Sequence, residues 1–313
     1  MRILAKLIPV PAKVAIVTRT LDRPQLLRRA LDSVLAQGFE DWSWVVVNSG
    51  DRGPVDALLE ERADALRGRF QLVNTSGPGP MGAATNAGVA ASDSEYIVLL
   101  DDDDSWHPTF LESAVAALDG RLSEDVRGIV TQTMVIEEVV AQQGLPQPTK
   151  EKKFNPHLEN LKLFHLASVN QFTVNAFLYE REAYDAIGPY REDLPVLDDW
   201  EYNLRFLRAY DIDVVAEPLA NYHIRVEDRE GATANSLTAG ERLHKFYEAR
   251  IANRLLREEL EAGQIGMGFL MNIAAGHRTE VDLVRAVARK LNSVSDKVGK
   301  IDSRTKQMKE NGL

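Results

Sequence analysis

Cysteine is absent from the 313-residue sequence, so the chain forms neither disulfides nor a thiolate zinc site, and we expect the cytoplasm. No apolar run approaches the roughly 18 residues of a membrane span. The first residues, interrupted by Lys6 and Pro9, do not resemble a secretory signal. Lys and Arg (37) are fewer than Asp and Glu (47), and the net charge of −10 argues against nucleic acid as a partner.

The first part of the sequence alternates between strand and helix patterns. Val14–Val17 is a short apolar run, and Pro24 then opens a helical pattern that stops at Gly38. Three more strand runs follow with helical patterns between them: Trp44–Val47, Phe70–Val73 and Tyr96–Leu100. This alternation predicts an α/β fold with a mainly parallel central sheet and helices on both faces, where ligands gather at the carboxyl ends of the strands.

Four consecutive aspartates, Asp101 to Asp104, stand at such a strand end. Like charges a few ångströms apart repel by about 1 kcal/mol per pair in water and by more near a protein surface, so the cluster needs a counter-charge. Mg²⁺ or Mn²⁺ would supply it, and such sites often combine one or two carboxylates with substrate phosphates. The alternative is that the aspartates only cap the helix expected from Pro108.

The second half is less regular until it becomes helical. Residues 129–140 alternate like a strand or hairpin, 142–157 have the composition of a solvated loop, and Phe172–Tyr179 is a further strand candidate. Helices are expected near 182–187, over 199–210 and from Glu241 onward. Apolar residues at heptad spacing mark the last helix: Val284, Val287, Leu291, Val294, Val298, Ile301 and Met308. They favour a homo-oligomer or docking to a partner subunit, and the basic character of the stretch leaves peripheral contact with the inner membrane face as the competing interpretation.

Several segments in this order resemble the family 2 glycosyltransferases, which have the nucleotide-diphospho-sugar transferase fold called GT-A. The segments are Val14–Pro24, Val45–Asp51, Asn86–Gly88, Glu95–Asp104 and Leu197–Trp200. The resemblance runs from about 14 to 225 and implies a catalytic domain over 1–237, with a nucleotide-sugar half (about 1–105) and an acceptor half (about 106–237). Residues 238–313 would then form a helical extension with the heptad segment at 284–308.

The resemblance also implies roles for the two acidic segments. Asp101-Asp102-Asp103 resembles the family's Asp-x-Asp motif, which binds the donor and its metal, with Asp103 as the direct metal ligand and Asp101 beside it. In Asp198-Asp199 the second carboxylate would be the general base that deprotonates an acceptor hydroxyl and inverts the anomeric carbon. Asp104 and Asp198 would face the acceptor, although capping of a helix is the alternative for each acidic segment.

Other matching positions are implied to contact substrates. The donor or nucleotide would meet the side chains of Thr20, Asn48, Asp51, Asn86, Asp102 and Arg225. His223 would complete the metal site, Trp106 would approach the acceptor, and 228–236 would be a lid. The sequence departs from the family at Arg19, where a proline is usual, and at Asn48, where an aspartate is usual, so the preferred base is not fixed.

The function implied is a metal-dependent, inverting glycosyltransferase of hexosyltransferase type. It would use Mn²⁺ or Mg²⁺ and move a sugar from a nucleotide-sugar donor to a hydroxyl of a glycan acceptor in bacterial polysaccharide biosynthesis. The expected donor is a UDP-sugar. A sugar-phosphate nucleotidyltransferase is one alternative, and a non-catalytic nucleotide-sugar-binding or assembly subunit is another. A dinucleotide-binding oxidoreductase is disfavoured, because residues 18–24 after the first strand contain no glycine.

Overall fold

The computed structural model describes residues 11–139, 146–225 and 240–310, without the side chains of 241 and 300–310. The chain divides into two compact units, Met1–Glu248 and Ala249–Leu313. The domain boundary expected at 237/238 and the lid expected at 228–236 lie outside the described residues.

The first half of the sheet is parallel. Its strands β1 (Val14–Thr20), β2 (Trp42–Asn48), β3 (Phe70–Asn74) and β4 (Tyr96–Leu99) take the order β3-β2-β1-β4. Nearly every residue of β1, β2 and β4 is buried, as expected for strands covered on both faces. Since β1 and β4 are parallel neighbours, with Val17 opposite Leu99, the residues that follow each strand emerge at the same edge of the sheet.

The second half of the sheet is mixed. The strand β8 (Phe177–Glu180) is antiparallel to both β4 and β6 (Val126–Val139), and β9 (Asp211–Arg225) is parallel to β6. Two further strands, β5 (Ser105–Trp106) and β7 (Gln147–Lys153), are antiparallel to β9 and β6, respectively.

One sequence expectation is wrong in this half. The solvated loop expected at 142–157 contains β7, whose seven residues are all exposed and which is held by pairing with β6. The segment 222–225, which contains His223 and Arg225, is the end of the long strand β9.

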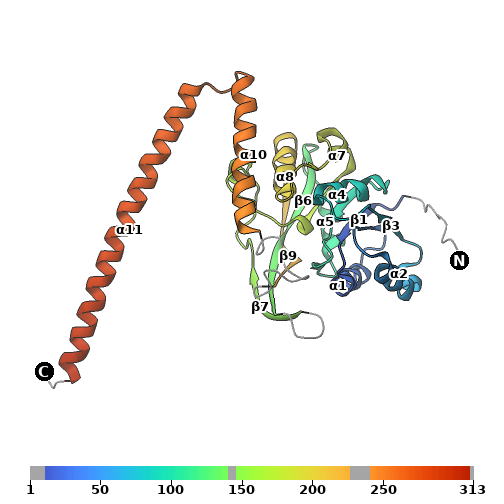
Figure 1. Cartoon of the computed structure of the whole chain (residues 1–313), viewed down its shortest axis with the longest axis horizontal. Helices are drawn as coiled ribbons and strands as arrows, with labels where there is room; N and C mark the ends of the chain where they lie inside the picture. Colours follow the sequence, from blue (N-terminus) through green and yellow to red (C-terminus); the bar gives the residue numbers. More distant parts are fainter. Residues whose placement is uncertain (1–10, 140–145, 226–239, 311–313) are drawn as a thin grey trace. The chain divides into compact units, whose positions relative to one another are not determined.

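Helices pack against both sides of the parallel strands. The largest are α1 (Pro24–Leu35), α2 (Arg52–Glu61), α4 (Met81–Ala90), α5 (Phe110–Asp119) and α8 (Asp198–Ala209), and shorter ones are α3 (Ala63–Leu66), α6 (Leu163–Leu166) and α7 (Arg181–Ile187). Figure 1 shows α4 and α1 on opposite sides of β1. The approach of α4 is close, because a Cβ on Gly88 would lie 3.0 Å from the side chain of Val47.

The C-terminal residues are helical, as expected. Helix α10 (Glu241–Glu261) is followed by α11 (Met267–Glu310). The heptad residues from Val284 to Val298 expose 49–66% of their surface. Among the described helices, none is both long enough and apolar enough to cross a bilayer.

Candidate active site

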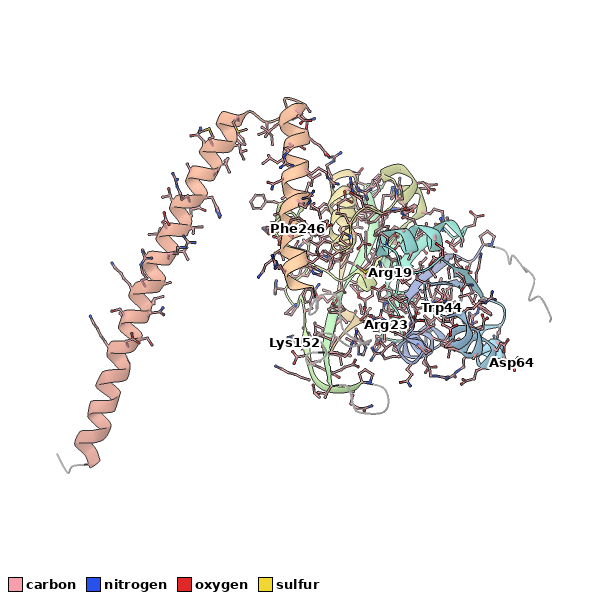
Figure 2. All side chains as sticks on the ribbon, viewed as in Figure 1. Arg19, Arg23, Trp44, Asp64, Lys152 and Phe246 are labelled. Atoms are coloured by element: carbon pink, nitrogen blue, oxygen red, sulfur yellow. The ribbon has the colours of Figure 1, made fainter. Side chains whose placement is uncertain are left out.

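Four arginines surround the aspartates that follow β4. Arg19 lies near the end of β1, Arg23 directly precedes α1, Arg29 lies within α1, and Arg225 ends β9. Asp102, Asp103 and Asp104 are buried, and Asp101 is half-buried. Figure 2 shows Arg19 and Arg23 in the interior of the first unit, whereas Lys152 projects from the β6–β7 hairpin.

Asp101 is held by Arg19. The guanidinium donates from Nε and Nη2 to the two carboxylate oxygens of Asp101 at 2.8 and 2.7 Å, a bidentate pair. Its third nitrogen, Nη1, donates to the hydroxyl of Thr85 on α4 at 3.2 Å and to the carboxylate of Asp198 at 3.4 Å. One side chain therefore connects the end of β4 with the start of α8.

Asp102 and Asp103 bind the other arginines. Asp102 accepts a hydrogen bond from Thr20 at 2.8 Å and forms an ion pair with Arg23 at 2.6 Å. Oδ2 of Asp103 pairs with Arg225 and lies 3.5 Å from Arg23. Within the described residues, Oδ1 of Asp103 accepts no hydrogen bond, so this oxygen is open.

Asp104 and His223 belong to a buried network of hydrogen bonds. The backbone N–H of His223 donates to Asp104 at 3.0 Å. The imidazole lies 2.8 Å from Glu138 through Nδ1 and 2.9 Å from the hydroxyl of Ser105 through Nε2. Burial, with the nearby charge of Arg29, lowers the pKa of His223, so the ring is neutral at pH 7.

The environment separates the pKa values of these carboxyl groups. Burial, helped by the charge of Asp103, raises the pKa of Asp102 to about 7 and holds that of Asp104 well above its usual range. Burial acts on Asp103 in the same direction, but the charges of Arg23 and Arg225 outweigh it and lower its pKa. Asp103 therefore loses its proton at a lower pH than Asp102 and Asp104 do.

The second acidic pair begins α8. Leu197, the residue before it, has left-handed backbone angles (φ 64°, ψ 20°), which are strained for leucine and are typical of functional sites. Asp198 is buried, and burial together with the charges of Asp199 and Asp101 raises its pKa to about 7. Asp199 is half-buried and accepts a hydrogen bond from Asn170 at 2.9 Å, and burial raises its pKa as well.

The two acidic segments share one site. Arg19 contacts both of them, and Asp101 acts electrostatically on Asp199. Tyr222 on β9 gives an independent indication: burial raises its pKa, and the charges of Asp104, Asp103, Asp101 and Asp199 add to that effect. Carboxylates that are nearly 100 residues apart in the sequence thus act on the same tyrosine.

Three residues that were predicted to contact the donor form hydrogen bonds with backbone groups of the protein itself. The side-chain amide of Asn48 donates to the carbonyl of Gly50 at 3.2 Å and accepts from its N–H at 3.1 Å. Asp51 caps α2 by accepting from Gly53 at 3.0 Å. Asn86 donates to the carbonyl of Tyr190 at 2.8 Å and accepts from its N–H at 2.9 Å. A contact of these three residues with a nucleotide stays a prediction.

Trp106 packs in the interior, and its predicted contact with the acceptor stays a prediction. Only 4% of its surface is exposed. Its indole N–H donates to the carbonyl of Asn175 at 2.7 Å, and its ring stacks on Phe110 with centroids 4.5 Å apart.

The chemistry of Asp103 fits a divalent metal ion, because a carboxylate oxygen is a ligand that Mg²⁺ and Mn²⁺ prefer. Both oxygens of Asp101 are bound to Arg19, and both ring nitrogens of His223 have partners. Of the predicted metal ligands, Asp103 is therefore the one with an oxygen, Oδ1, that is unpaired within the described part of the chain. Among the described side chains, no three acidic or histidine residues form a ready metal-binding group. A Mg²⁺ or Mn²⁺ site that is completed by substrate phosphates needs only one or two carboxylates.

Sequence reasoning missed several residues of this network: Arg23, Arg29, Ser105, Glu138 and Asn170. A signal existed for Arg23, because β1 and β4 are both buried strands of a parallel sheet, and cations that follow one strand can meet anions that follow its neighbour. Glu138 and Asn170 had no such signal, since their approach depends on how the second half of the chain folds back.

Solved structures share the fold. TarS 1–349 of S. aureus in complex with UDP-GlcNAc superposes with a TM-score of 0.52 at 14% identity, over 80% of this chain and 73% of that one. The mannosyltransferase PcManGT of Pyrobaculum calidifontis, in complex with GDP-Man and Mn²⁺, gives 0.50 at 14% identity, over 86% and 81%. At such identities the likeness shows the fold alone, and it confirms the predicted GT-A fold.

Sequence relatives point the same way. The succinoglycan biosynthesis protein ExoW of Rhizobium meliloti (strain 1021) is 35% identical over 97 residues, 30% of this chain, and the match spans only 30% of the length of ExoW. The profile described as Glycosyl transferase family 2 matches residues 15–188. That match covers more than half of the sequence, and the chain therefore belongs to glycosyl transferase family 2.

Proposed function

We propose that this chain is an inverting, metal-dependent glycosyltransferase that moves a sugar from a UDP-sugar to a hydroxyl group of a glycan, in the assembly of a bacterial polysaccharide. The observation that carries the proposal is the bridge formed by Arg19 between Asp101 and Asp198. It brings the acidic motif at the end of β4 and the carboxylates at the start of α8 into one site, as transfer between a donor and an acceptor requires.

Asp103 would hold the metal through its open oxygen Oδ1, together with phosphate oxygens of the donor. The low pKa of Asp103 keeps this ligand ionised, and its pairing with Arg225 fixes its orientation. When bound, a divalent cation neutralises the charge that develops on the leaving diphosphate. Arg23, which is part-buried beside Asp103, adds positive charge on the same side.

Asp199 would act as the general base. A new bond forms between the acceptor oxygen and the anomeric carbon while the bond from that carbon to the diphosphate breaks, and its electron pair leaves with the phosphate. The acceptor's proton passes to Asp199, whose raised pKa favours proton uptake. Asn170 binds Oδ2 of Asp199 at 2.9 Å and orients the carboxylate.

The choice of a UDP-sugar rests on fold-level similarity to TarS with UDP-GlcNAc, whereas PcManGT binds GDP-Man. A thermal-shift panel of UDP, GDP, CDP and dTDP, each with and without Mn²⁺, tests the base and the metal together. At one hundred times its Kd, a ligand stabilises the folded state by about 2.7 kcal/mol, which such a scan detects readily. We expect the largest shift for UDP with Mn²⁺.

Two variants test the division of roles. Asp103→Ala should abolish the Mn²⁺-dependent shift, whereas Asp199→Asn should keep the shift and lose sugar transfer. Asp193→Asn, at an exposed position paired with Arg191, is the control and should preserve both properties. Absence of a metal-dependent shift with every nucleotide, or equal loss of binding in the first two variants, would contradict the proposal.

A further inference from the structure

Arg19 is committed to two carboxylates at once. Its side chain is 12% exposed, and its three nitrogens donate to Asp101, Thr85 and Asp198. The pair with Asp101 uses both oxygens of that carboxylate, at 2.8 and 2.7 Å. A guanidinium cannot lose its charge at any working pH, so this positive charge is permanent.

A divalent cation that binds Asp101 would either break its hydrogen bonds with Arg19 or lie close to the positive guanidinium. Like charges within a few ångströms repel, and the repulsion is stronger in a partly buried site than in water. Asp103 differs because, among the described residues, only one of its oxygens is paired. The two outer carboxylates of the Asp-x-Asp motif are therefore unequal in this chain, and the inequality comes from Arg19.

We propose that Arg19 is a positioning residue that withholds Asp101 from the metal and leaves Asp103 as the one carboxylate of the motif that binds it. The same guanidinium also binds Oδ2 of Asp198 at 3.4 Å, so one side chain joins the motif to the second acidic pair, in which Asp199 is the proposed base. This inference rests on the proposed function, and it concerns how the aspartates divide the work.

Arg19→Met tests the inference because it removes the charge and keeps most of the side-chain volume. Calorimetric titration with Mn²⁺, in the presence of saturating UDP, measures metal affinity without any need for turnover. We expect Arg19→Met to bind Mn²⁺ at least about tenfold more tightly than the wild type, since Asp101 becomes available as a second ligand. Arg28→Met is the matched control, because Arg28 forms a bidentate pair with Glu61 at 2.6 Å outside the site, and it should bind Mn²⁺ as the wild type does.

Asp101→Asn, alone and combined with Arg19→Met, completes a double-mutant cycle. In the wild-type background it should change Mn²⁺ affinity by less than about twofold, whereas in the Arg19→Met background it should remove the gain. If Arg19→Met does not fold, Arg19→Lys takes its place: an ammonium cannot hold Asp101 bidentately, and a smaller gain is expected.

Two outcomes overturn the inference. One is a folded Arg19 variant that binds Mn²⁺ with wild-type or weaker affinity, and the other is an Asp101→Asn variant that loses as much affinity as Asp103→Asn. A wild-type protein that binds no Mn²⁺ with UDP would instead refute the proposed function itself and the inference with it, so the two failures are distinguishable.

Discussion

Asp198→Asn should make the stability of the first unit less sensitive to pH. Burial, together with the charges of Asp199 and Asp101, raises the pKa of Asp198 from 3.8 to about 7. The folded state therefore binds this proton more tightly than the unfolded state, and the wild type loses stability as the pH rises from about 4 to 7. A shift of three pKa units corresponds to about 4 kcal/mol. Asparagine has no charge to bury, so the variant lacks this loss.

Urea unfolding followed by tryptophan fluorescence measures the effect. All four tryptophans lie in Met1–Glu248, so the signal reports on the unit that contains Asp198. The free energy of unfolding of the variant minus that of the wild type should rise by up to about 4 kcal/mol between pH 4 and 7 and stay constant above about pH 8.

A control of opposite sign is available at Glu61. The hydrogen bond from Arg28 lowers the pKa of this exposed carboxylate, so Glu61→Gln should lose a little stability relative to the wild type as the pH rises. The protonation changes that are common to wild type and variant cancel in each difference. A difference for Asp198→Asn that does not change with pH would refute the reasoning.

Two further substitutions test the packing around the site. Trp106→Phe should lower the free energy of unfolding by about 1–3 kcal/mol, because it leaves the buried carbonyl of Asn175 without its donor, and UDP binding measured by calorimetry should not change. Leu197→Gly should be more stable than Leu197→Ala by about 1 kcal/mol in urea unfolding, because both remove the side chain and only glycine adopts φ 64° without strain; equal stabilities would contradict this.

The sequence predicts the parallel half of the fold because its signals are local. The strands β1, β2 and β4 are short apolar runs buried on both faces, and the first two are each followed directly by a helix. The strand β7 has no such signal. All seven of its residues are exposed, and its conformation depends on hydrogen bonds to β6, which no local pattern reveals.

The same distinction applies to the site. The acidic segments are readable because each is contiguous and follows or begins a regular element. Their partners are not, since Arg19 and Asp198 are separated by 179 residues and meet only when α8 packs beside the end of β1. The sequence shows Arg19 as a departure from the family pattern, but only the folded chain shows that the departure joins the two halves of the site.

The counter-charge that the four aspartates need is supplied in part by the protein. Among the described residues, the network contains four arginines and seven acidic side chains: Asp101, Asp102, Asp103, Asp104, Glu138, Asp198 and Asp199. Burial raises the pKa values of Asp102, Asp104 and Asp198, and the protons that these groups retain reduce the excess of negative charge. In the proposed metal site the two kinds of cation would be complementary: the guanidinium groups hold most of the carboxylates, and a divalent cation would bind Oδ1 of Asp103, which is unpaired among the described residues.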